Sequence, residues 1–189
     1  MHYHYYKKSR DAAWQILIDS DIETMPVSVL KICRSLGIKV IYYDFLDENE
    51  LGRVTFLNNI ACIMIRRNLD NKMKRYVCAH ELGHLILNHF SEGTSYSCSI
   101  NDIKHGLESG AEQFAISLLC PICILWKCNI TTAEEASEVF GIEKFLAEKR
   151  VARLKLLKKR GKFLTSPLEI EVYNKFLPFI EKYLLDKKQ

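Results

Sequence analysis

The sequence predicts a mainly helical α+β protein with a small, mostly antiparallel three-stranded sheet and a C-terminal helical part with a helix-turn-helix-like arrangement. Short runs rich in Ile, Val, Tyr and Phe are confined to residues 38–65, and this composition is typical of strands. On both sides of that region, apolar residues recur at helical spacing. The chain shows no internal repeat, low-complexity tract or obvious interdomain linker.

The composition is that of a globular protein with no strong charge bias. The 189 residues are 48% hydrophobic and carry a formal net charge of +4, which is too small to require a nucleic-acid partner. No apolar run reaches the length of a membrane helix. The N-terminal stretch MHYHYYKKSR has no apolar core of a signal peptide. We therefore expect a cytoplasmic protein that does not engage a membrane.

Two helices are expected before the sheet, at residues 9–20 and 26–36. Pro26 suits the first turn of the second helix, and Gly37 suits its end. The expected strands cover residues 38–46, 52–57 and 60–65, with Asn58-Asn59 as a hairpin turn.

The remainder of the chain is expected to be helical apart from a Ser/Gly-rich loop, SEGTSYSCSIN. A break is expected at Gly141, and Pro178 should kink or split the last segment. The expected helices cover residues 70–90, about 102–119, 132–140, 143–159 and 166–186.

The stretch RYVCAHELGHLILNHF, residues 75–90, carries two histidines four residues apart with a glutamate directly after the first. Residues at this spacing differ by about 40° around a helix axis and lie one turn apart. His80 and His84 can therefore bind one ion, and neutral imidazole is a preferred zinc ligand. Glu81 would lie next to that ion, where it can take a proton from water that the ion activates. This pattern indicates a metal-dependent hydrolase.

The alternative is a partly exposed helix with solvated histidines, because H-E-x-x-H alone is only moderately specific. The apolar surface of the helix favours burial instead, and buried polar groups need partners such as a metal. Gly83 is a poor helix former and suits close approach of another element or of substrate. The apolar residues are Val77, Cys78, Leu82, Leu85 and Ile86.

A third ligand is expected, since a catalytic zinc usually has three protein ligands. His89 lies five residues after His84, which in a continuing helix places it away from the pair. Glu108 and Glu112 in the next helix are four residues apart and share a face. One can coordinate the metal while the other hydrogen-bonds a ligand histidine and fixes its tautomer. The spacing leaves open which carboxylate does which.

Two helical motifs carry a more specific resemblance. The first is AHELGHLILNH, residues 79–89, and the second, E-x-x-A-x-x-F-A-x-x-L-L-x-P, runs from Glu108 to Pro121. They follow a helix with the pattern P-V-x-V-x-x-I-x-x-x-L-G-I-K-V and the small sheet. Over roughly residues 10–155 this order resembles the ImmA/IrrE family of zinc metallopeptidases. Glu112 stands where that family usually has Asn or Asp, and Cys120 replaces the usual Met.

The resemblance implies a zincin-like metallopeptidase domain, which we expect over residues 1–128. We expect residues 129–189 to form a helical extension packed on the same core. The resemblance also implies one Zn²⁺ per chain, held by His80, His84 and Glu108, with Glu81 as the general base. Glu112 is then the residue expected to hydrogen-bond a ligand histidine.

The mechanism that follows is metal-assisted hydrolysis of a peptide bond, in which Glu81 takes the proton of water and passes it to the leaving amine. The developing oxyanion needs a donor besides the metal. Tyr96 and His105 are the main candidates for that donor, with Tyr76 as a third. We also expect the strand around residues 60–66 to be an edge strand that pairs with extended substrate.

The resemblance further implies a regulatory protease whose protein substrate is a helix-turn-helix transcriptional repressor. One alternative is a non-catalytic anti-repressor module, against which Glu81 argues because a pure binder needs no base. Another is a DNA-binding regulator that uses residues 131–160, where the basic stretch KRVARLKLLKKRGK begins at Lys149. We expect these charges to be solvated and no nucleic acid to be bound.

The seven cysteines are odd in number and scattered, which is typical of reduced, buried thiols. The segment CPICILWKC, residues 120–128, contains C-x-x-C but lacks a fourth ligand at suitable spacing for a second metal. We therefore expect its thiols to pack in the core.

Overall fold

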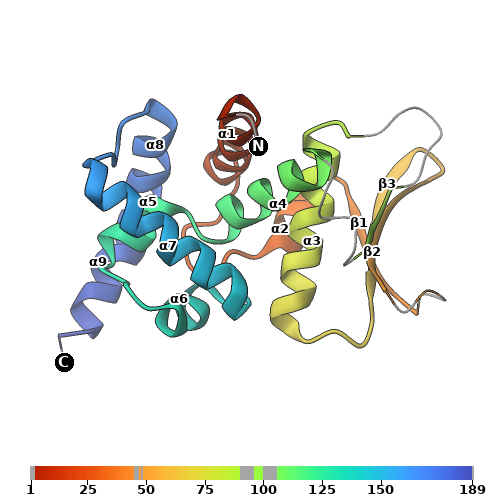
Figure 1. The fold of residues 1–189 in the computed structure, drawn as a ribbon. Helices are drawn as coiled ribbons and strands as arrows, with labels where there is room; N and C mark the ends of the chain where they lie inside the picture. Colours follow the sequence, from red (N-terminus) through yellow and green to blue (C-terminus); the bar gives the residue numbers. More distant parts are fainter. Residues whose placement is uncertain (1–2, 45–46, 48, 90–95, 100–105, 189) are drawn as a thin grey trace. The chain divides into compact units, whose positions relative to one another are not determined.

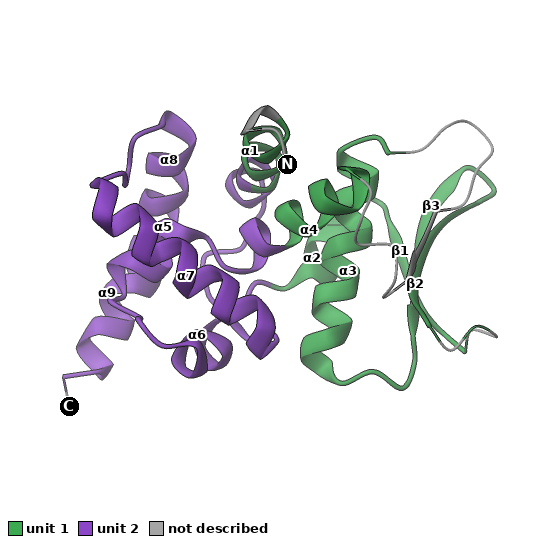
Figure 2. Ribbon diagram, viewed as in Figure 1, with its two compact units in different colours: residues 1–13, 28–115 green, residues 14–27, 116–189 purple. Residues whose placement is uncertain are grey.

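The protein, in a computed structural model, is described over residues 3–44, 47, 49–89, 96–99 and 106–188. These residues form helices and one small mixed sheet (Figure 1), so the predicted mainly helical α+β class is confirmed. The chain divides into two compact units (Figure 2): residues 1–13 with 28–115, and residues 14–27 with 116–189. The expected division into domains at residue 128 stays a prediction.

The sheet lies in the first unit and has the order β1-β3-β2-β4. β1 is parallel to β3, while β2 is antiparallel to both β3 and β4. Asn58 and Asn59 both have positive φ, 50° and 63°, so the turn between β2 and β3 is the expected hairpin. The strands are β1 (Lys39–Tyr43), β2 (Glu50–Leu57), β3 (Ile60–Arg66) and β4 (Tyr96–Ser99).

Two expectations about the sheet were wrong. β4 lies in the segment that was predicted to be a loop, because YSCS has no apolar run. Its strand conformation comes from its pairing with β2, which the sequence does not indicate. β3 was expected at an edge, but it is paired on both sides, with β1 and with β2. Sequence order indicates the β2–β3 hairpin but not the parallel addition of β1 to the other side of β3.

The helices of the first unit start and end differently from the prediction. α2 begins at Val29 after Ser28, so Pro26 lies outside it. α3 begins after Asp70, whose carboxylate accepts hydrogen bonds from the backbone N–H groups of Lys72 and Met73. The helices are α1 (Tyr3–Asp19), α2 (Val29–Ser35), α3 (Asn71–Ile86) and α4 (Gly106–Leu119). The last residues of α1, from Trp14 on, and the last residues of α4, from Ile116 on, belong to the second unit.

α3 packs against β2 and β3 (Figure 1). Its buried residues Val77 and Leu82, with Val54 of β2 and Ile63 and Ile65 of β3, belong to the core of the first unit. Because these side chains are removed from water, their burial fixes α3 on the sheet.

The second unit is helical. Gly141, with φ of 57°, ends α6 in the left-handed conformation, and the Ser166 hydroxyl accepts a hydrogen bond from the backbone N–H of Glu169 at the start of α8. The predicted split at Pro178 is confirmed, with α8 ending at Lys175 and α9 beginning at Leu177. The helices are α5 (Ile122–Lys127), α6 (Ala133–Phe140), α7 (Lys144–Arg160), α8 (Pro167–Lys175) and α9 (Leu177–Asp186).

The core of this unit is largely aromatic and aliphatic, with Trp14, Phe140 and Phe176 among its largest fully buried side chains. The short helix α5 was not predicted, since six residues give too little periodicity to recognise. Among the described residues, no helix combines the length and the apolar character needed to cross a bilayer.

Candidate metal centre

The middle of α3 is buried over eight consecutive residues, from Val77 to His84. His80 is 3% exposed and His84 is 0% exposed. The alternative of solvated histidines is therefore wrong. Two imidazoles and the carboxylate of Glu81 are held away from water, where polar groups without partners are costly.

Three side chains converge at this level of α3. Nε2 of His80 lies 3.0 Å from Nε2 of His84 and 3.0 Å from Oε2 of Glu108. Nε2 of His84 lies 3.3 Å from Oε1 of Glu108. In the part of the chain that the structure describes, these residues are the one group of three His, Cys, Asp or Glu side chains with ligand atoms all within 4.8 Å of one another. Two imidazole nitrogens and a carboxylate oxygen form a donor set that suits zinc.

Gly83 explains how Glu108 of α4 reaches the two histidines of α3. A Cβ atom on Gly83 would lie 3.0 Å from Cδ1 of Phe114 and 3.2 Å from both Cα and the carbonyl oxygen of Ala111. The two helices are thus closer here than a larger residue permits. Glu108 precedes Ala111 by three residues on the same helix, so this contact brings its carboxylate to the imidazoles. The expected close approach at Gly83 is made by another element.

The structure distinguishes the two carboxylates that the spacing left open. Glu108 is buried and belongs to the cluster, whereas Glu112 is half-buried and does not. The geometry thus agrees with the ligand set implied by the family resemblance. That Glu112 accepts a hydrogen bond from a ligand histidine stays a prediction.

The predicted position of His89 was wrong. α3 ends at Ile86, and Asn88 then adopts a left-handed conformation with φ of 55°. The chain turns back, so that Nδ1 of His89 lies 3.1 Å from Nδ1 of His84. The two rings meet edge to face, with centroids 5.1 Å apart. Asn88 was the feature of the sequence that could have predicted this helix end, because Asn is common as the left-handed residue after a helix.

The surroundings of the cluster favour an ionised Glu108 and a neutral His84. Burial opposes ionisation of Glu108, but the hydrogen bonds with His80 and His84 outweigh it and lower the pKa of this carboxyl to about 2. Burial lowers the pKa of His84. Burial and the neighbouring His84 lower the pKa of His89 to about 4. An anionic oxygen and neutral imidazoles are the protonation states that metal ligands require.

Glu81 is fully buried, and neither of its carboxylate oxygens has a hydrogen-bond partner among the described residues. Burial raises its pKa well above the ordinary value, and the charges of Glu108 and Glu50 raise it further. Nδ1 of His80 likewise lacks a partner there. A cation among His80, His84 and Glu108 would offset the negative charge of the unpartnered Glu81 carboxylate. The residues present therefore fit a metal ion.

Of the three candidate oxyanion donors, the structure describes the side chain of Tyr76 alone. His105 lies outside the described residues, and only the backbone of Tyr96, in β4, is described. The ring of Tyr76 lies on α3 with its centroid 5.8 Å from that of His80. The role of donor stays a prediction for all three.

The other features picked out by the sequence lie outside this cluster. Burial raises the pKa of the thiols of Cys120, Cys123 and Cys128 to about 12, so these thiols stay protonated at neutral pH.

Gly141 separates α6 from α7 as expected, and Lys144 pairs with Glu134 across that turn at 3.0 Å. DNA binding by this helix pair was not expected, and nothing in these contacts changes that prediction.

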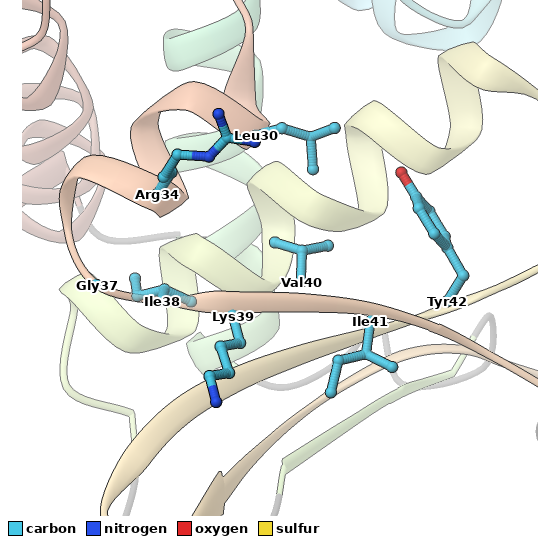
Figure 3. Close-up of a pocket in the computed structure, with 8 residues that line it drawn as sticks. All are labelled: Leu30, Arg34, Gly37, Ile38, Lys39, Val40, Ile41 and Tyr42. Carbon is cyan, nitrogen blue, oxygen red and sulfur yellow. The ribbon is translucent and has the colours of Figure 1, made fainter.

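A surface pocket in the first unit is also separate from the cluster. Leu30 and Arg34 of α2 line it together with Val40 and Tyr42 of β1 (Figure 3). Of the predicted site residues whose side chains the structure describes, none lines it.

A buried His-His-Glu cluster on two packed helices, with an unpaired glutamate next to the first histidine, is compatible with the metal site of a metallohydrolase. Comparison with protein families gives the particular group. The model of the Peptidase M78 family, described as the IrrE N-terminal-like domain, matches residues 33–152, well over half of the chain. The chain belongs to this family, as the resemblance in the sequence implied. The match includes every residue of the cluster, as well as Glu81 and His89.

Membership of a peptidase family supports a metallopeptidase-type function with a metal ion and a protein substrate. Among curated proteins, no relative matches the chain.

Proposed function

We propose that this protein is a regulatory zinc endopeptidase that hydrolyses a peptide bond in a helix-turn-helix transcriptional repressor. The convergence of His80, His84 and Glu108 beside the buried, unpartnered carboxylate of Glu81 carries the catalytic part of the proposal. The choice of substrate is supported by the family resemblance.

Nε2 of His80, Nε2 of His84 and one carboxylate oxygen of Glu108 are the atoms that would hold the ion. Three protein ligands leave a position for water or substrate, as in catalytic rather than structural zinc sites. When bound, Zn²⁺ would supply a Lewis acid that increases the acidity of water and polarises the scissile carbonyl. The burial of all three ligands excludes bulk water from the ion's protein side.

Glu81 is the general base of this proposal. Its carboxylate accepts the proton of the attacking water, and the protonated side chain then donates that proton to the leaving amine. Burial and the nearby carboxylates of Glu108 and Glu50 raise its pKa, which makes it a stronger base than an exposed glutamate once a cation keeps it ionised. Its position directly after His80 on α3 would hold it next to an ion bound by the three ligands.

The first unit orients these groups through packing. A Cβ atom on Gly52 of β2 would lie 3.2 Å from Oε1 of Glu81, so the strand closes directly over the base. α4 fixes Glu108 through its contact at Gly83. The base and the third ligand are thus held by a strand and a helix, which position them more narrowly than loops do.

A comparison of newly formed protein N-termini tests the proposal. The zinc-loaded wild type and Glu81→Gln are incubated in parallel with a protein extract of the source organism, and new N-termini are identified by mass spectrometry. The proposal predicts a small set of cleavages, in helix-turn-helix repressors, that only the wild type produces. Identical N-termini from both proteins would contradict the proposed hydrolysis and favour the anti-repressor module. Wild-type cleavage of many unrelated proteins would contradict the regulatory role.

A further inference from the structure

We propose that His89 is a positioning residue that holds the imidazole of His84 in the tautomer and orientation required for metal binding. This inference rests on the proposed metal site and adds to it a residue outside the ligand set. It is carried by the 3.1 Å contact between Nδ1 of His84 and Nδ1 of His89.

The direction of this hydrogen bond follows from the opposite side of the His84 ring. Nε2 of His84 faces His80 and Glu108, at 3.0 Å and 3.3 Å. A metal ligand must present a lone pair, so this nitrogen carries no proton when an ion is held. The proton of a neutral His84 is then on Nδ1, where it is donated to Nδ1 of His89. His89 accepts it and must carry its own proton on Nε2.

His89 is held in place by the end of α3. The backbone N–H of Leu87 donates to the carbonyl of Gly83, and the N–H of His89 donates to the carbonyl of His84, at 3.0 Å each. Together with the left-handed Asn88 these bonds return the chain to the last turn of the helix. The His89 ring is therefore set beside His84 by the backbone before any ion binds.

Gly110 provides the space for this ring. A Cβ atom on Gly110 of α4 would lie 3.3 Å from Cε1 of His89 and 3.4 Å from Oγ of Ser9 in α1. A larger residue here would press on the His89 ring. Gly110 is two residues after Glu108, so the same turn of α4 delivers the third ligand and accommodates His89.

The two ligand histidines differ in whether their Nδ1 atom has a hydrogen-bond partner. Nδ1 of His84 has His89 as its partner, whereas Nδ1 of His80 has none among the residues that the structure describes. Hydrogen bonds to the second nitrogen of a ligand histidine commonly raise metal affinity by about 10–100-fold. His84 is therefore the ligand whose geometry the protein controls before binding.

The test uses zinc affinity, measured by competition with a chromophoric chelator, for the wild type, His89→Leu and His89→Asn. Asn can present an oxygen near the position of Nδ1, so it retains the acceptor that Leu removes. We expect His89→Leu to weaken zinc binding by about 10–100-fold and His89→Asn to recover most of that loss. Thermal unfolding of the metal-free proteins checks that both variants fold. Equal zinc affinity of His89→Leu and the wild type would overturn the inference, as would equal weakening by both variants.

The tautomers of the wild type provide a readout that does not depend on a variant. Long-range ¹⁵N–¹H correlation spectra of the zinc-loaded protein should show His84 protonated on Nδ1 and His89 protonated on Nε2. A proton on Nδ1 of His89 would overturn the inference while leaving the metal site intact. Failure of the wild type to bind zinc would instead overturn the proposed metal site. Normal zinc affinity without any cleavage would count against the peptidase function alone.

Discussion

Gly83 of α3 lies so close to Ala111 of α4 that a Cβ atom on the glycine would be 3.2 Å from the Cα atom of the alanine. The contact is between two helix backbones, and neither can yield as a flexible side chain can. Along α3, Gly83 lies three residues after His80 and directly before His84, and along α4, Ala111 lies three residues after Glu108. The distance between these helices therefore sets the distance between the metal ligands.

Gly83→Ala should force the helices apart and weaken both the fold and metal binding. Overpacking of this kind destabilises proteins by about 1–3 kcal/mol. The matched control is Gly106→Ala at the start of α4, where an added Cβ meets no atom of the described residues within 4 Å. The control should leave stability unchanged or raise it by up to about 1 kcal/mol, because Ala favours helix more than Gly. Urea unfolding of both variants, with zinc content measured alongside, makes the comparison. Equal effects of the two substitutions would contradict the close-packing account.

Gly52→Ala should disturb the base through a different contact. The added Cβ would overlap with Cγ1 of Val77, so that one of the two elements must move. Since Oε1 of Glu81 is also within 3.2 Å of that Cβ, we expect lower stability and lower peptidase activity.

Removal of Cγ1 in the double variant Gly52→Ala/Val77→Ala relieves the closest of these contacts. A double-mutant cycle of unfolding free energies should therefore show coupling of about 0.5–3 kcal/mol. Additive effects of the two substitutions would show that β2 does not press on α3 at Val77.

Metal removal should lower the thermal stability of the wild type. An ion that binds only the folded state at about 100 times its dissociation constant contributes roughly 2.7 kcal/mol. For a chain of this size that corresponds to a fall in Tm of roughly 5–10 °C when a chelator is added. Glu108→Ala should show a much smaller response to the same chelator. A wild-type Tm that is insensitive to chelation would argue against an ion within this cluster.

Glu135 in the second unit provides a pH-dependent prediction that is independent of the metal centre. Burial disfavours its charge, but hydrogen bonds from Lys187 and from the hydroxyl of Tyr183, at 2.7 Å for the latter, lower the pKa of the carboxyl. Because the folded-state pKa lies below that of the unfolded chain, the stabilisation is present at neutral pH. It is lost as the pH falls through the folded-state pKa.

Glu135→Gln should therefore lower the unfolding free energy by about 1 kcal/mol at pH 7, since the side chain is partly exposed, and by less at pH 3. The control Glu134→Gln removes an exposed carboxylate paired with Lys144 and should have the smaller effect. Chemical unfolding at both pH values measures the difference. A loss that is the same at pH 3 and pH 7 would contradict the assignment.

The pair of candidate metal-binding histidines on α3 could be predicted because four-residue spacing on a helix is a local property. His80, Glu81 and His84 need only the helix to form, and the apolar residues around them indicated its burial. Glu108 was one of two equivalent candidates by spacing, since Glu112 lies on the same face. Their difference depends on where α4 crosses α3, and local sequence does not define that crossing.

His89 shows how one backbone residue can reverse a prediction. If α3 continued, His89 would point away from His84, and the expectation assumed a helix to residue 90. The helix stops four residues earlier, and the left-handed Asn88 turns the chain back. Helix ends are set by competition between capping and propagation, which differ by little free energy. The strand β4 escaped prediction for a similar reason, because four residues acquire their conformation only from pairing with β2.

The central claim is tested most directly by metal stoichiometry, measured by elemental analysis of the wild type and Glu108→Ala purified without added metal or chelator. The account predicts about one zinc per wild-type chain and its loss or strong weakening in Glu108→Ala. A wild type without metal, or zinc content unaffected by the substitution, would contradict the His80–His84–Glu108 site.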